Sequence, residues 1–249
     1  MGLKNFVDSG INTTKKIYES GNEAILLNNL SLLEFFGKAL KDTSIGAYNV
    51  FIKAEIDGLL KKGEVEKVVN ETSDKVAYLL GGYYLNPSTL LNIKNKLEQS
   101  GVKTILINER YNSKKTLGNT IRNLKEKINQ EKGKDIVLFG YSAGGVIAHR
   151  IGRMKGYKSV SFGITDKLSE TMVGTLLSLT KDDKIKDFNL PDSGINIEET
   201  FSAMVPNMKD SKKNSIRLDN VYSHMAIGRD DVIEEINKQI LMAFKSKRI

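Results

Sequence analysis

The chain contains no cysteine and only two histidines, His149 and His224, among its 249 residues. Without cysteine it can form no disulfide, bind no metal through thiolates and use no cysteine nucleophile. Two histidines also make the usual zinc sites hard to assemble. We therefore expect neither a metal nor a cofactor, and any histidine-assisted catalysis has to use one of these two side chains.

The sequence also lacks a long uninterrupted apolar segment. Charged residues divide the first 20 positions, and polar residues divide the most apolar stretch, residues 24–40. Neither segment has the apolar length of a secretory signal or of a membrane-spanning helix. We expect a cytoplasmic protein, with peripheral attachment to a membrane as the alternative.

Negative charge is in deficit, since 38 Lys and Arg residues against 30 Asp and Glu residues give a formal net charge of +8. Such an excess raises the question of an anionic partner. The sequence has no zinc-finger spacing, no aromatic RNA-recognition pattern and no compact arginine cluster. We therefore expect a solvated surface and no nucleic-acid partner, with an anionic membrane surface as the alternative.

The spacing of apolar residues divides the chain into two regions. In residues 1–72 they recur at three- and four-residue steps, which predicts helices. From residue 73, short apolar runs alternate with amphipathic helical patterns, as is typical of a parallel sheet wrapped by helices. We predict a helical N-terminal segment, 1–72, and an α/β domain, 73–249. The segment either packs on that domain or docks on lipid or a partner.

Within the α/β domain the pattern predicts six strands and the helices between them. One helix is predicted to begin at Asn86, because asparagine is a good N-cap and the proline that follows suits the first helical position. The expected fold is a mostly parallel sheet with helices on both faces. The predicted strands are 76–80, 102–107, 136–139, 160–164, 195–201 and 215–218.

A Gly-x-Ser-x-Gly motif at residues 140–144 carries the main chemical signal. The motif is short, but an apolar strand precedes it and a helix follows it, and this context makes it informative. A serine there occupies a tight turn, and the helix N-terminus directs N–H groups at the charge that develops in acyl transfer. The spacing fits neither a Walker A loop nor a dinucleotide fingerprint. Ser142 is therefore the candidate nucleophile.

Activation of a serine requires a base within hydrogen-bond reach. His149 follows Ser142 by seven residues, on the helix that leads away from the turn, so we interpret it as a helix or core residue. His224 lies between the last predicted strand and the final helix. A loop there can return to the same edge of the sheet as the turn, which makes His224 the candidate base.

These features resemble the α/β-hydrolase superfamily, in particular its lipase and esterase branches, over residues 75–249. The resemblance is carried by the strand ending in Gly81-Gly82, the motif at 140–145 and the histidine loop at 221–227, which occur in the family's order. It implies an oxyanion hole formed by the backbone N–H groups of Ala143 and Tyr83. Lipases often have histidine where this chain has Gly81, but the donor is a backbone group, so the hole remains.

The acid of the implied catalytic triad has more than one candidate. Many family members place an aspartate after the penultimate strand, where this chain has Ser202. Others, pancreatic-type lipases among them, place it one strand earlier, where this chain has Asp166. The resemblance therefore implies Asp166, which could instead cap the next predicted helix. Glu199 and Glu198 are the alternatives, followed by another aspartate or no acid at all.

The sequence thus predicts a serine hydrolase that acts on a small-molecule or lipid-like carboxylic ester through an acyl-enzyme. Thioester hydrolysis and acyl transfer remain open because they proceed through the same intermediate. A degenerate hydrolase that serves as a non-catalytic binding module is the other alternative, and its support is Ser202 and Gly81 at positions where the family often has catalytic or supporting residues.

Overall fold

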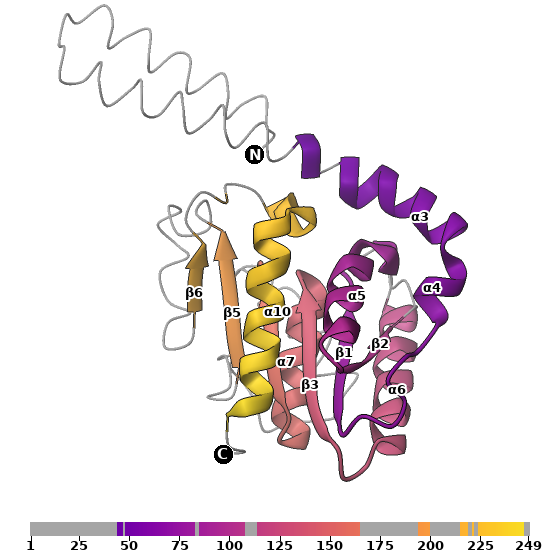
Figure 1. Ribbon diagram of the computed structural model, residues 1–249, viewed down its shortest axis with the longest axis vertical. Coiled ribbons are helices and arrows are strands. Elements are labelled where there is room, and N and C mark those ends of the chain that lie inside the picture. The colour runs from indigo at the N-terminus through magenta and orange to yellow at the C-terminus, as the bar shows by residue number, and fades with distance from the viewer. Residues whose placement is uncertain are drawn as a thin grey trace, which may run out of the picture. The chain divides into compact units, whose positions relative to one another are not determined.

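A six-stranded sheet forms the centre of the protein. The computed structural model describes residues 44–46, 48–82, 85–107, 114–164, 194–199, 215–218, 221 and 224–246. All strand pairs in the sheet are parallel, in the order β2-β1-β3-β4-β5-β6 (Figure 1). The six predicted strands are confirmed to within two residues at each end. Their bounds are β1 Lys75–Leu80, β2 Lys103–Leu106, β3 Asp135–Tyr141, β4 Lys158–Phe162, β5 Gly194–Glu199 and β6 Ser215–Leu218.

The order of the strands reverses at β1. From β1 the chain passes to β2 at one edge, and it then returns to form β3 on the other side of β1. In open parallel sheets, ligand sites form outside the carboxyl ends of the strands, where the order reverses. Here that place is the edge where β1 ends at Leu80 and β3 ends at Tyr141. Both turns that the sequence singled out begin there.

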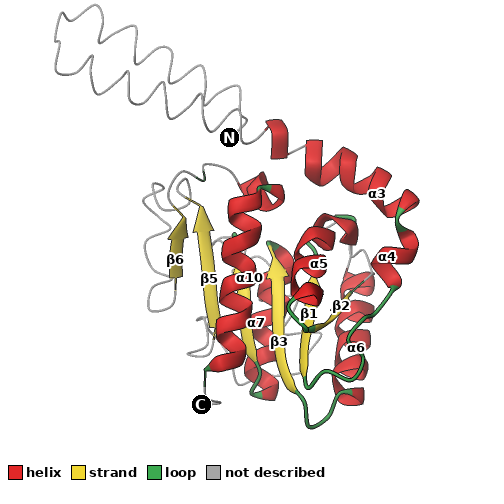
Figure 2. Ribbon diagram, in the orientation of Figure 1, coloured by secondary structure: helices red, strands yellow, loops and turns green. Residues whose placement is uncertain are grey.

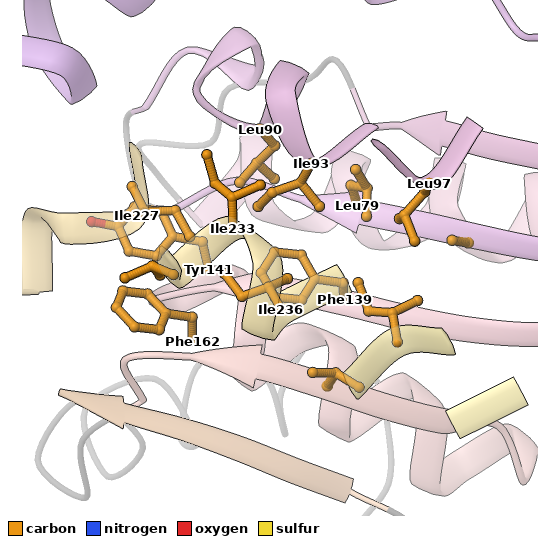
Figure 3. Packing of buried hydrophobic residues seen from close by; sticks show 14 of the residues in the cluster. Leu79, Leu90, Ile93, Leu97, Phe139, Tyr141, Phe162, Ile227, Ile233 and Ile236 are labelled. Atoms are coloured by element: carbon orange, nitrogen blue, oxygen red, sulfur yellow. The ribbon is translucent and has the colours of Figure 1, made fainter. Parts of the chain in front are cut away.

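Helices cover both faces of the sheet, which confirms the predicted fold class (Figure 2). Alternate residues of a strand point to opposite faces, and β1 therefore contributes to two separate cores. Tyr78 packs with α6 (Lys114–Gln130) and α7 (Ala143–Lys155). Leu79 packs on the other side with α5 (Leu91–Gln99) and α10 (Asp230–Lys245), in the cluster that Figure 3 shows.

The helix predicted to begin at Asn86 forms as expected. It opens with the 3-10 helix η2 (Pro87–Leu90), and the Asn86 side chain accepts a hydrogen bond of 3.1 Å from the Ser88 N–H. The segment continues as α5, and the chain leaves it through Gly101, whose φ of +78° favours glycine. Local chemistry alone therefore specifies both ends of this segment.

Three helices of the N-terminal region are described: η1 (Tyr48–Lys53), α3 (Ala54–Leu60) and α4 (Lys62–Glu66). Their helical character confirms the prediction for this stretch. This stretch contains the apolar residues Val50, Phe51, Ala54, Leu59 and Leu60. Val50 and Ala54 are buried, whereas Leu59 is 82% exposed and Leu60 79%. The face that contacts the rest of the domain carries the small residues Gly46, Ala54 and Gly58. The two leucines do not belong to that face.

All described residues lie in the unit Asp42–Ile249, and the predicted boundary between residues 72 and 73 stays a prediction. The apolar pattern at residues 24–40 lies outside the described residues. Within the described part of the chain, no helix combines the length and the apolar content needed to cross a membrane.

Candidate active site

Ser142 occupies a sharp turn between β3, which ends at Tyr141, and α7, which begins at Ala143. Its backbone has φ 54° and ψ −124°, a region that residues with a side chain rarely enter. Among the described non-glycine residues, only Asn70 shares a positive φ. Two hydrogen bonds of 2.9 Å hold this conformation, one from Ser142 N–H to the Phe162 carbonyl and one from Gly145 N–H to the Ser142 carbonyl.

The glycines that flank Ser142 allow three segments of backbone to meet. A Cβ atom on Gly140 would lie 2.2 Å from the Gly144 carbonyl carbon, and one on Gly144 would lie 2.3 Å from the Gly81 oxygen. Both distances are far below contact distance, so no larger residue fits at either position. The end of β1, the end of β3 and the start of α7 are therefore packed backbone to backbone.

Of the two predicted donors of the oxyanion hole, the structure describes Ala143. Ala143 is the first residue of α7, where an N–H group has no carbonyl one turn earlier to bond. Tyr83 lies outside the described residues. The residue before it, Gly82, is close to the nucleophile, because a Cβ atom on Gly82 would lie 3.4 Å from the Ser142 Cβ. The turn that begins at Gly81 therefore lies beside Ser142.

His224 is the first residue of the 3-10 helix η4 (His224–Gly228), of which only the backbone is described at His224 itself. Its neighbour Met225 accepts a hydrogen bond of 3.7 Å from the hydroxyl of Tyr141, the residue before Ser142. The ring of Tyr141 stacks on that of Phe162, with 6.1 Å between the ring centroids, and Figure 3 shows Ile227 of η4 beside this pair. The structure thus brings the His224 segment to the serine turn, while the role of His224 as the base stays a prediction.

The acid also stays a prediction. Asp166 lies outside the described residues, and Glu198 and Glu199 end β5 with only their backbone described. Glu198 and Glu199 are the last two residues of β5, at the edge of the sheet that also carries Ser142. The described residues exclude none of the three candidates.

His149, as expected, lies in the core on α7 and is fully buried. Its Nδ1 lies 2.6 Å from Ser159 Oγ, and its Nε2 lies 2.8 Å from Ser161 Oγ. The Ser161 hydroxyl donates to Asn196 Oδ1 at 2.8 Å, and Asn196 Nδ2 donates to the Ile164 carbonyl at 3.3 Å. Because Ser161 donates to Asn196, it accepts from Nε2–H, and Nδ1 accepts from Ser159.

This buried network was missed by the sequence analysis. Its signal is weak but present, since Ser159 and Ser161 alternate along β4 and both are completely buried. Burial lowers the pKa of His149 to about 3, so the imidazole stays neutral at neutral pH. His149 is therefore a structural residue that fastens α7 to β4 and, through Ser161 and Asn196, to β5.

The low pKa of His149 predicts a loss of stability in mild acid. The unfolded histidine binds a proton below about pH 6.5, whereas the folded one binds it only near pH 3. The free energy of unfolding should therefore fall by up to about 1.4 kcal/mol for each pH unit below 6.5. Urea titrations between pH 4.5 and 8 measure this slope.

The matched variant for that measurement is His149→Gln, which keeps a polar side chain but does not titrate. Its unfolding free energy should depend less on pH than that of the wild type over the same range, although it is lower throughout. Parallel pH dependences for the two proteins would contradict the assignment of a neutral buried imidazole.

The sheet order, the strained serine between β3 and α7 and the position of η4 define the α/β-hydrolase fold.

No group of three or more acidic, histidine or cysteine side chains in the described ranges is arranged to hold a metal ion.

No protein-family model and no curated protein matches the chain. Among solved structures, it is similar to one reported for LipS and LipT, two metagenome-derived lipolytic enzymes (10% identity, 70% of this chain, 95% of that chain, TM-score 0.46). It is also similar to an extracellular α/β-hydrolase from a Paenibacillus species (10% identity, 68% of this chain, 98% of that chain, TM-score 0.46). A third similar structure is that of the RedJ thioesterase of the prodiginine biosynthetic pathway in Streptomyces coelicolor (11% identity, 68% of this chain, 92% of that chain, TM-score 0.45). Similarities this distant carry no information about substrate.

Proposed function

We propose that the protein is a serine hydrolase that cleaves a carboxylic ester, lipid-like or another acyl ester, through an acyl-enzyme on Ser142. The observation that carries this proposal is the strained backbone of Ser142, held beside Gly82 at the edge where the strand order reverses. Strain of this kind costs about 1–3 kcal/mol and is concentrated at functional sites.

The proposed mechanism gives each candidate residue a defined role. Ser142 Oγ attacks the ester carbonyl carbon while His224 accepts the hydroxyl proton, and the N–H groups of Ala143 and Tyr83 stabilise the oxyanion. His224 then gives the proton to the leaving alcohol, and the acyl group remains on Ser142. Water then attacks the acyl carbon while His224 accepts its proton, and this proton passes to Ser142 Oγ as the carboxylic acid leaves. Asp166, with Glu199 and Glu198 as alternatives, orients the imidazole.

A fluorophosphonate probe tests this proposal directly. The probe phosphonylates an activated serine and releases fluoride, so the intact protein should gain the mass of one phosphonyl group. Peptide mapping should locate that group on Ser142. Absence of labelling would favour a non-catalytic binding module on the same fold.

Thioester hydrolysis and acyl transfer are the alternatives on the same site. All three reactions share the acyl-enzyme, and they differ in the leaving group and in what accepts the acyl group. A panel of esters and thioesters of increasing acyl length, assayed with and without an added alcohol acceptor, distinguishes them.

We also propose that an anionic lipid surface is a partner. Six large apolar side chains of residues 45–60 are 47–82% exposed, and they lie in one region of the chain: Ile45, Tyr48, Ile52, Ile56, Leu59 and Leu60. Three lysines of the same region, Lys53, Lys61 and Lys62, keep 42–72% of their side chains exposed, and they pair with Asp57 and Glu66. The exposed apolar side chains would therefore supply the contact with lipid, and the net charge of +8 of the whole chain favours an anionic surface.

Exchange of both Leu59 and Leu60 for serine should reduce co-sedimentation with phosphatidylglycerol-containing vesicles at least about tenfold. Fluorophosphonate labelling in solution should be unchanged. The matched control is Met242→Ser on α10, which removes a side chain that is 50% exposed away from this region. If the double variant binds vesicles as the wild type does, lipid docking through this face is wrong.

A further inference from the structure

The helices η1 and α3 contact both loops that carry predicted catalytic groups. In Figure 1 they lie at the upper right, beyond the arrowhead of β3. The segment that includes η1 contacts η4, which begins at His224, and α3 contacts η2, which follows the turn at Gly81–Gly82. These two consecutive helices therefore touch the start of the histidine segment and the segment that follows the predicted oxyanion loop.

The first contact joins Gly46 to Met225. A Cβ atom on Gly46 would lie 2.4 Å from the Met225 carbonyl oxygen and 2.5 Å from its Cβ, so only glycine fits there. Met225 follows His224 directly and accepts the hydrogen bond from Tyr141. The backbone next to the predicted base is thus held between Gly46 on one side and the residue before the nucleophile on the other.

The second contact joins α3 to the exit of the oxyanion loop. Asn86 Nδ2 donates to Glu55 Oε2 at 3.2 Å, and the Ser88 hydroxyl donates to the Ala54 carbonyl. A Cβ atom on Gly58 would lie 2.4 Å from Asn86 Nδ2, so α3 lies directly against the Asn86 amide. Asn86 and Ser88 are both buried, which makes these hydrogen bonds costly to lose.

A short path connects this second contact to the nucleophile. Asn86 follows Leu85, whose N–H donates to the Gly82 carbonyl at 3.3 Å. Gly82 in turn lies beside Ser142. A displacement of Asn86 would therefore shift Leu85 and Gly82, between which the predicted oxyanion donor Tyr83 lies in the sequence.

We propose that Gly46 and residues 48–58, together called the N-terminal clamp, position the two catalytic loops against each other. Gly46 sets the backbone of the His224 loop, and Gly58 with Asn86 sets the oxyanion loop; these three are positioning residues. The proposal rests on the proposed hydrolase function. Catalysis depends on such placement, because an error of about 1 Å can cost about a hundredfold in rate.

Alanine at Gly46 or Gly58 tests the clamp, with Gly63→Ala as the matched control. Gly63 lies on the neighbouring helix α4, and a Cβ atom there would meet nothing within 4 Å. Each variant is assayed for its rate constant of fluorophosphonate labelling and for kcat and KM on a short acyl ester. Both are measured well below the thermal unfolding midpoint of that variant.

Gly46→Ala and Gly58→Ala should lower kcat and the labelling rate constant at least about tenfold, with KM within about twofold of the wild type. Gly63→Ala should match the wild type in all three quantities. A merely structural role for the two glycines would lower the unfolding midpoint and leave kcat of the folded protein unchanged.

A double-mutant cycle shows whether the effect of Gly58→Ala passes through Asn86. Asn86→Ala removes the amide that the new methyl group would strike, so Gly58→Ala should have little further effect in that background. Additive effects would overturn this path. If Gly46→Ala does not fold, the cycle still tests the contact between α3 and Asn86.

The labelling results distinguish a failure of the clamp proposal from a failure of the proposed hydrolase function. A wild type that labels on Ser142, with folded Gly46→Ala and Gly58→Ala variants that label equally fast, overturns the clamp and leaves the hydrolase intact. A wild type that does not label overturns both.

Discussion

Ser142→Ala is expected to lower the rate of ester hydrolysis by at least about three orders of magnitude, because it removes the atom that forms the acyl-enzyme. The side chain is only half-buried, and alanine takes the same backbone conformation with similar difficulty. The free energy of unfolding should therefore change by less than about 1 kcal/mol. Steady-state kinetics on a short acyl ester, together with urea unfolding of the same sample, measure both quantities.

The two histidines provide the sharpest control for this result. His224→Ala should be about as damaging to turnover as Ser142→Ala, whereas His149→Ala should reduce stability and leave the folded protein active. A loss of turnover greater with His149→Ala than with His224→Ala would show that the base is placed wrongly. Ester hydrolysis by Ser142→Ala near the wild-type rate would exclude Ser142 as the nucleophile.

Asp166→Asn is expected to lower kcat by about two to four orders of magnitude with little change in KM. A carboxylate fixes the tautomer of the base and stabilises the imidazolium that forms in the transition state, and an amide does neither. Asparagine is as good an N-cap as aspartate, so this exchange removes the charge and preserves the capping role. Kinetics at several pH values, on protein shown to be folded, give the answer.

Glu198→Gln and Glu199→Gln complete that experiment. If Asp166 is the acid, both should turn over within a fewfold of the wild type. Near-normal kcat for Asp166→Asn, combined with a large loss in one glutamine variant, would move the role to that residue. Near-normal kcat in all three would leave the base without a charged partner among these candidates.

The sequence predicted the sheet and the serine turn well because both depend on local signals. Apolar runs specify buried parallel strands, and the cap at Asn86 and the motif around Ser142 act over a few residues. Its order of elements also placed the His224 segment at the correct edge. These features need no knowledge of how distant segments pack.

Features that depend on distant packing could not be predicted in the same way. Leu59 and Leu60 have the spacing of a buried helical face, but the clamp turns its small residues inward, and close approach to η2 and η4 decides which face is covered. The partners of His149 come from β4 and β5, and nothing in the local sequence indicates that the ring would accept from Ser159 and donate to Ser161.

The directed hydrogen-bond network around His149 also constrains how the protein can evolve. Each of His149, Ser159, Ser161 and Asn196 is completely buried, and one order of donors and acceptors joins them and continues to the Ile164 carbonyl. Loss of one member leaves another unsatisfied at a cost of about 1–3 kcal/mol, whereas joint replacement by apolar residues of similar shape is nearly neutral. The four positions should therefore drift as a single unit, retained together or exchanged together.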